Sequence, residues 1–145
     1  MENTVRMVMD KTEIPVVAID EMNKTHEREA DLVNSLFEMI SAHQSGTPAS
    51  DALTAAVSDF RDHMERHFSR EEEMMEQAGF PAFHVHKREH DRVRAELDAI
   101  LAPLHTSNDF SPLADYLQNT HPDWAKNHIA TMDTMTAFYI VRSAS

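Results

Sequence analysis

Apolar residues recur at helical spacing in several separate stretches of this chain. From about Asp20 to His43 they repeat every three or four residues, as the buried face of an α-helix does. The same period runs from Ser50 to Ala78, where Ser50 is placed to cap a helix, and from Pro81 to His105. After a short helix from Phe110 to Leu117, a last period begins near Pro122 and reaches about residue 141. The pattern therefore predicts four main helices.

Helices in this order with short connections predict an all-α fold, an antiparallel up-down-up-down four-helix bundle. The first nineteen residues lack a helical period and hold Pro15 within a β-branched run, which predicts an extended N-terminal arm lying across the body. A length of 145 residues suits a single core. We expect an arm at residues 1–19 and a bundle domain at residues 20–145.

Composition removes several classes of function. A net charge of -12 without a Lys/Arg cluster argues against nucleic acid or an anionic membrane as a partner. The opening residues lack signal-peptide features and no apolar run is long enough to cross a bilayer, so we expect a cytoplasmic protein. The absence of Cys excludes disulfides, thiolate catalysis and iron–sulfur clusters. Any metal must be bound by nitrogen and oxygen.

Candidate metal ligands lie on the apolar faces of all four main helices. In an antiparallel bundle, the start of the first and third helices meets the end of the second and the later half of the fourth. The motifs HFSRE and HKREH each place two ligands four residues apart, one turn above the other. Five imidazoles and two carboxylates make a complete ligand set for two iron ions. The candidates are His26, His67, Glu71, His86, His90, His128 and Asp133.

The spacing in the last helix differs from that of the other motifs. His128 and Asp133 are five residues apart, which corresponds to an offset of about 140° on an ideal α-helix. Both side chains can then reach inward only from opposite sides of the seam between the helices. We expect this arrangement to suit a carboxylate that bridges two ions rather than one that stacks under its histidine.

Two other metalloprotein patterns are absent. Ferritin-like di-iron enzymes use Glu-x-x-His pairs, and no histidine of this chain has Glu three residues before it. The sequence HEREA at His26 fails the His-Glu-x-x-His pattern of zinc proteases. These differences argue against ferroxidase or hydroxylase chemistry of the ferritin type and against zinc proteolysis.

The chain resembles the hemerythrins, in particular the single-domain bacterial ones, over roughly residues 18 to 140. The resemblance rests on His26, HFSRE with the acidic EEMM after it, GFP, HKREH and WAKNHIATMD. It implies two iron ions bridged by Glu71, Asp133 and a solvent-derived oxo or hydroxo group. It further implies that three histidines saturate one iron and that two hold the other, which keeps a position for dioxygen. These are His86, His90 and His128 on the first iron, and His26 and His67 on the second.

The function that the resemblance implies is reversible binding of dioxygen for carriage, storage or delivery, without enzymatic turnover. Neutral imidazole ligands leave the centre more positive than a carboxylate-rich set, which disfavours high-valent iron and supports reversible binding. Two alternatives stay open. One is a di-iron enzyme that detoxifies peroxide or nitric oxide, and the other is a sensor of oxygen or redox state.

Some residues depart from the family pattern or lie outside the ligand set. Many relatives carry an acidic residue three positions before the first ligand histidine, where this chain has Asn23. His63 is predicted to be a core histidine beside the ligands rather than an eighth ligand, and Trp124 a packing residue. Glu72 and Glu73 are expected to be solvated. Four histidines are expected at the surface: His43, His84, His105 and His121.

Overall fold

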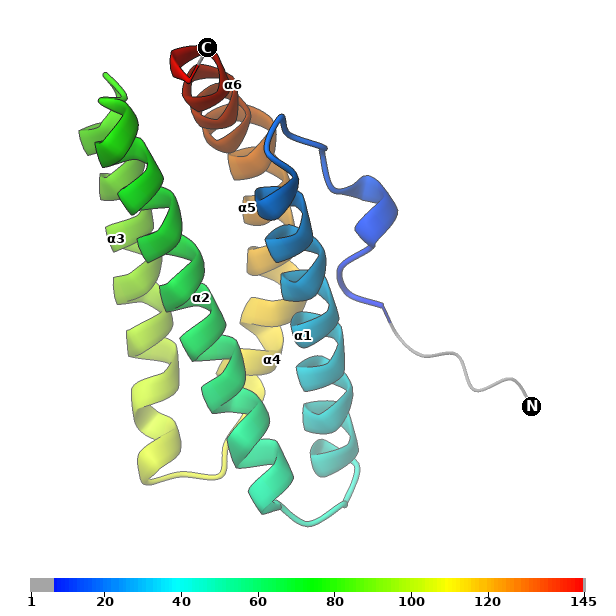
Figure 1. The fold of residues 1–145 in the computed structure, drawn as a ribbon. Coiled ribbons are helices and arrows are strands. Elements are labelled where there is room, and N and C mark those ends of the chain that lie inside the picture. Colours follow the sequence, from blue (N-terminus) through cyan, green and yellow to red (C-terminus); the bar gives the residue numbers. More distant parts are fainter. Residues whose placement is uncertain (1–6, 145) are drawn as a thin grey trace.

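Four helical rods run antiparallel and side by side in the computed structural model, which describes residues 7–144 (Figure 1). Three rods are single helices, and the fourth consists of three helices joined without a break by two π turns. The all-α up-down-up-down bundle predicted from the sequence is confirmed. The rods are α1 (Asp20–Gln44), α2 (Asp51–Ala78), α3 (Phe83–Leu101), and α4 (Ser111–Asp115) with η3 (Tyr116–Thr120), α5 (His121–His128), η4 (Ile129–Asp133) and α6 (Thr134–Ser143).

Helix α2, the longest, begins and ends at the residues expected from its sequence. The Ser50 hydroxyl accepts a hydrogen bond from the Leu53 backbone N–H at 3.2 Å, which satisfies one of the free amides of the first turn. At the other end Gly79 takes the left-handed conformation with φ of 63°, which costs a residue without a Cβ nothing. The Phe80 N–H then bonds back to the Met75 carbonyl at 2.9 Å. The tight stop turns the chain directly toward α3.

The fourth rod differs from the prediction of two separate helices. It is helical from Ser111 to Ser143, and Pro122 lies in the first turn of α5, as expected. Proline has no amide hydrogen and its ring clashes with the carbonyl four residues earlier. The wider π turn Tyr116–Thr120 precedes it and takes up that irregularity, so the helix continues.

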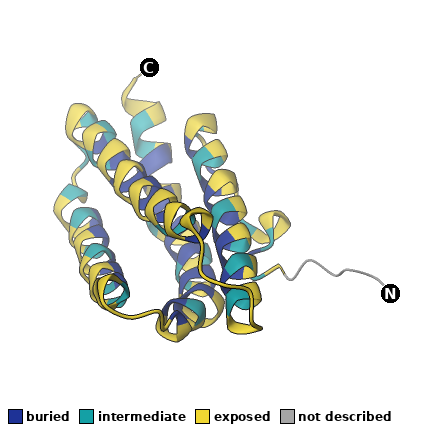
Figure 2. Cartoon of the chain, turned by 90° about the horizontal axis from the view of Figure 1, so that it is seen from below, coloured by how far each residue is buried: buried dark blue, intermediate teal, exposed yellow. Residues whose placement is uncertain are grey.

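Each rod turns its buried residues toward the other rods (Figure 2), and most of these residues are apolar. Aromatic and branched side chains from different helices meet there with almost no exposed surface. Among the largest fully buried are Phe60, Phe68, Leu36, Ile40 and Leu117. Within residues 7–144, eleven polar or charged residues are also buried, and these need partners of their own.

The N-terminal arm lies against α1, as predicted. Met9 and Val17 are buried in the core, and two asparagines of α1 bind the arm's backbone. The Asn34 side chain accepts from the Met9 N–H at 2.9 Å and donates to its carbonyl at 2.8 Å, and Asn23 does the same with Val17 at 2.9 and 3.0 Å. The arm is not extended throughout, because the 3-10 turn Lys11–Glu13 interrupts it.

Residues 1–6 of the predicted arm lie outside the described residues, and the division of the chain after residue 19 stays a prediction. Within residues 7–144, none of the helices combines the length and the apolar character that crossing a membrane requires.

Candidate metal centre

The seven predicted ligand residues come together inside the bundle. Each is buried, with at most 5% of its surface exposed. Their nitrogen and oxygen atoms form two groups, and within each group the atoms lie within 4.8 Å of one another. The two carboxylates belong to both groups, whereas three histidines belong only to the first and two only to the second. The groups are Glu71, His86, His90, His128 and Asp133, and His26, His67, Glu71 and Asp133.

Helical spacing accounts for most of this arrangement. His67 and Glu71 stand one turn apart on α2, with 2.7 Å between His67 Nε2 and Glu71 Oε2. His86 and His90 stand one turn apart on α3, with ring centroids separated by 4.5 Å. From the start of α1, His26 Nε2 approaches Asp133 Oδ2 of the fourth rod to 3.0 Å.

The expected geometry of His128 and Asp133 is wrong, because the helix between them is not an ideal α-helix. Residues 129–133 form the π turn η4, in which backbone hydrogen bonds span five residues. The two side chains therefore stand one above the other, and His128 Nε2 lies 3.2 Å from Asp133 Oδ1. The Thr134 hydroxyl donates to the Ile129 carbonyl at 2.7 Å, five residues back. The extra residue brings both groups to the same side of the helix.

The site holds polar atoms that the protein itself leaves unsatisfied. Seven buried side-chain atoms of the described residues have no hydrogen-bond partner, and all except His63 Nε2 belong to His26, Glu71, His90 and Asp133. Such an atom costs roughly 1–3 kcal/mol when it stays unpaired. Imidazole nitrogens and carboxylate oxygens facing one another across a few ångströms are the donors that a divalent transition metal uses. The residues present fit a metal ion.

The charges of the site also fit the binding of a metal ion. Burial alone would raise the pKa of Glu71 and of Asp133, but the surrounding histidines hold the pKa of both carboxyl groups below the usual range. Burial alone would lower the pKa of His26, yet Asp133 and Glu71 raise it to about 9. In His86, burial prevails and lowers the pKa. Without metal, protons on some imidazoles therefore balance the carboxylates, and a bound cation replaces those protons.

A buried carboxylate that was not predicted from the sequence supports His67. Glu29 is 1% exposed and accepts a hydrogen bond from His67 Nδ1 at 2.7 Å. It also accepts from His121 Nε2 at 3.0 Å, and His63 Nε2 lies 3.4 Å away. Burial alone would raise the pKa of Glu29, but contact with His67 and the other histidines keeps this pKa well below its usual value. The ionised Glu29 thereby holds the His67 ring in one orientation.

The prediction that His121 lies at the surface is wrong. Its side chain is fully buried, and it is Glu29 that makes this burial possible. The signal was present in the sequence, since His121 precedes His128 by seven residues, two turns on the same face. His63 is buried beside the ligands as expected. Of the other three predicted surface histidines, His84 and His105 are exposed and His43 is half-buried.

The prediction that Glu72 is solvated is also wrong, whereas Glu73 is exposed as expected. Glu72 accepts a hydrogen bond from His90 Nδ1 at 2.8 Å and one from Arg94 Nη1 at 2.7 Å. Glu72 therefore fixes the orientation of the His90 ring through Nδ1, as Glu29 does for the His67 ring. Arg94 reaches across from α3 and supplies the charge that keeps Glu72 in place.

The remaining histidines of the set are held in different ways. His86 Nδ1 lies 2.8 Å from the Thr136 hydroxyl oxygen, and the Trp124 ring stacks on His128 at 4.6 Å. The packing role predicted for Trp124 thus has a specific partner. His26 Nδ1 has no hydrogen-bond partner within the described residues, and the nearby Asn23 side chain binds the backbone of Val17 in the arm.

Comparisons with known proteins find the same kind of protein over most of this chain. The family model Hemerythrin HHE cation binding domain matches residues 17–137. A bacteriohemerythrin of Aquifex aeolicus is 28% identical over 116 residues, covering 80% of this chain and 85% of that protein. A bacteriohemerythrin of Ralstonia nicotianae is 32% identical over 95 residues, 65% of this chain and 68% of that protein. A myohemerythrin of Sipunculus nudus is 35% identical over 68 residues, 47% and 49% of the two chains. No solved structure gave a significant match.

Proposed function

The chain belongs to the hemerythrin family, and we propose that it is a non-haem di-iron protein that binds dioxygen reversibly for carriage, storage or delivery. The observation that supports this most strongly is the buried set of five imidazoles and two carboxylates, divided into two groups that share both carboxylates. A carboxylate that belongs to two ligand groups is suited to bridging two ions.

In this proposal the three histidines of the first group would hold one iron, and the two of the second group would hold the other. Glu71 and Asp133, which belong to both groups, would be shared between the two ions. When bound, the iron pair would supply the electrons that make reversible binding of dioxygen possible. Dioxygen would bind on the side of His26 and His67, where the ligand group has one histidine fewer.

The protein's own residues keep the site in shape and keep water away from one side. Glu29 and Glu72 orient His67 and His90 through their Nδ1 atoms, which directs both Nε2 atoms into the site. The Phe68 ring stacks on His90 at 4.1 Å, and Trp124 covers His128. These aromatic faces exclude water on the side with three histidines, which limits proton-assisted loss of electrons from the centre.

A second candidate function is an enzyme that detoxifies peroxide or nitric oxide. A cleft of about 780 Å³ is lined by His67 and Glu71, on the side with two histidines. Nitric oxide is diatomic like dioxygen and needs far less room, but peroxide is larger and more polar, and a cleft of this size gives it space to approach the site. The alternative of an oxygen or redox sensor, the cytoplasmic location and the absence of nucleic acid and membrane partners stay predictions from the sequence.

Exposure of the anaerobically reduced, iron-loaded protein to air distinguishes the two functions. We expect a coloured adduct whose absorption spectrum returns to that of the reduced protein when the solution is flushed with argon. The cycle should repeat without loss of iron. Irreversible oxidation in the first cycle, or multiple turnovers of added peroxide, would favour the enzyme and contradict carriage.

Replacement of Glu29 by Gln tests the support of His67. The amide keeps the size of the side chain but loses the charge that holds the His67 ring, so we expect iron affinity to fall by about 10- to 100-fold. Competition with a chelator measures the affinity. Glu27→Gln is the matched control, because Glu27 lies on the same helix and is exposed, and it should leave the affinity unchanged. Equal affinities of both variants would rule out a role for Glu29 in metal binding.

A further inference from the structure

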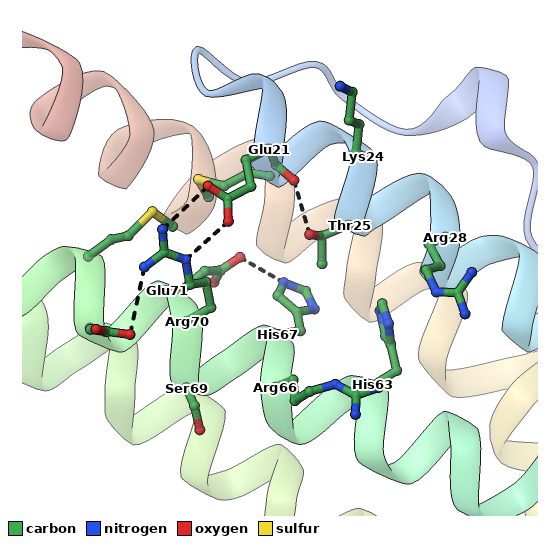
Figure 3. A pocket seen from close by; sticks show the side chains of 13 residues that line it. Glu21, Lys24, Thr25, Arg28, His63, Arg66, His67, Ser69, Arg70 and Glu71 are labelled. Atoms are coloured by element: carbon green, nitrogen blue, oxygen red, sulfur yellow. Dashed lines mark hydrogen bonds and ion pairs between the residues drawn. The ribbon is translucent and has the colours of Figure 1, made fainter.

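The cleft beside His67 is unusually basic for this chain. It lies between α1 and α2, and its lining includes side chains of both helices (Figure 3). The whole sequence has only 13 Lys and Arg residues and a net charge of -12, yet Lys24, Arg28, Arg66 and Arg70 all line this cleft. Positive side chains are therefore concentrated here on an otherwise acidic protein.

Two of these cations are neutralised by neighbouring carboxylates. Arg70 Nε donates to Glu21 at 3.0 Å, and its Nη1 lies 3.6 Å from Glu73. Lys24 Nζ lies 3.3 Å from Asp20. Arg70 thus pairs with two lining carboxylates, Glu21 and Glu73, whereas Asp20 lies outside the lining. The lining as a whole holds four cationic side chains and three carboxylates, the third being Glu71.

Arg28 and Arg66 have no such partner. Neither forms an ion pair or a hydrogen bond with any residue of the described chain. They extend from facing helices, Arg28 from α1 and Arg66 from α2, and His63 lies between them (Figure 3). His63 is 6% exposed, and its Nε2 atom lies 3.4 Å from Glu29 Oε1 without a well-formed hydrogen bond. Two free guanidinium groups thus flank a buried imidazole at one place in the cleft.

We propose that this cleft binds a small organic anion, whose carboxylate or phosphate group is held between Arg28 and Arg66. Guanidinium groups present paired N–H donors that match the oxygen atoms of both kinds of group. A volume of about 780 Å³ lies in the range of small-molecule sites rather than that of a diatomic ligand. The occupant would lie beside His67 and Glu71, so it would cover the side of the metal site that the aromatic rings leave open.

The acidic surface opposes this binding only weakly. At physiological ionic strength, charges farther away than about 8 Å are largely screened. The two guanidinium groups lie within the cleft, where they contact the anion directly, whereas most of the negative charge is distributed over the exterior. Glu71 is the lining carboxylate not paired with Arg70, and it is surrounded by histidines of the metal site. The local charge therefore determines the binding.

Calorimetric titration of the purified, iron-loaded protein with inorganic phosphate and with acetate, at constant ionic strength, tests the proposal. These two probes carry the bare headgroups, so they also show which of the two the cleft prefers. We expect at least one to bind with a dissociation constant of roughly 1 mM or lower. Arg28→Gln and Arg66→Gln should each weaken binding by about threefold or more, and the double variant by about tenfold or more.

Arg61→Gln is the matched control. Arg61 is exposed on the same helix as Arg66, outside the cleft, and its loss changes the net charge by the same amount. It should leave the affinity within about twofold of the original. All variants are compared at equal iron content and with an unchanged helical circular dichroism spectrum. Equal weakening in Arg61→Gln would show a general charge effect and overturn the proposal.

Two further results would also overturn it. If the double variant binds as tightly as the original protein, the anion binds elsewhere, including at the metal. If neither probe binds at concentrations up to about 50 mM, the cleft does not recognise an oxyanion. The proposal does not depend on reversible oxygen binding, because iron content and the oxygenation spectrum are measured separately from the titration.

Discussion

Replacing His90 by Ala is expected to lower the iron content of the purified protein from about two ions per chain to one or none. His90 is fully buried, and its Nε2 atom has no hydrogen-bond partner although Glu71 Oε1 lies 3.3 Å away. Glu72 fixes the ring through Nδ1. Loss of the imidazole removes one ligand and leaves Arg94 as the remaining partner of Glu72, so the effect on metal binding should be among the largest of any single change.

His84→Ala provides the comparison. His84 lies on the same helix, six residues earlier, and is exposed. Its loss should leave the iron content as it is. Both variants are expressed with ample iron, and metal is measured by elemental analysis per folded chain. The same iron content in both variants would contradict the assignment of His90 as a ligand.

Removing the metal is expected to make the stability of the protein depend strongly on pH. In the metal-free site Asp133 and Glu71 raise the pKa of His26 from 6.5 to about 9. A raised pKa contributes stability that is fully present below pH 6.5 and is lost as the pH rises through 9. For His26 alone this corresponds to roughly 3 kcal/mol. The pKa of His67 is also raised, so its contribution has the same sign.

In the iron-loaded protein these nitrogens bind metal rather than protons, so this loss should be absent. Urea denaturation of both forms at pH 6.5 and pH 9.5 measures the difference. The metal-free His26→Gln variant should show a smaller loss than the metal-free original. If the two forms lost stability equally over this pH range, protons would not occupy the metal-free site in the way described.

Much of the bundle could be predicted because the period of an α-helix tells which residues of the sequence share one face of that helix. His67 with Glu71, and His86 with His90, are four residues apart, and α2 and α3 carry both pairs inward. The antiparallel order of the helices also predicted, without any knowledge of contacts, that His26 lies at the same height along the bundle axis as these pairs. The seven residues lie together, as expected, because their heights along the bundle agree.

The residues that were missed depend on contacts between distant parts of the chain. Glu29 and His121 bond to each other across 92 positions. His121 lies two turns before His128 on the same face, but nothing in the local sequence marks Glu29 as its partner. Whether a charged side chain is buried follows from its partner, so Glu72 could not be placed before Arg94 was known to reach it. The π turn before Thr134 was missed because an α-helical period of 3.6 residues was assumed for the whole rod.

Anomalous X-ray scattering from crystals of the iron-loaded protein, measured on both sides of the iron absorption edge, locates the metal ions themselves. We expect two iron peaks in each chain, with Glu71 and Asp133 contacting both and with three histidines on one iron and two on the other. A single peak, a peak that shows zinc in place of iron, or two ions that share neither carboxylate would contradict it.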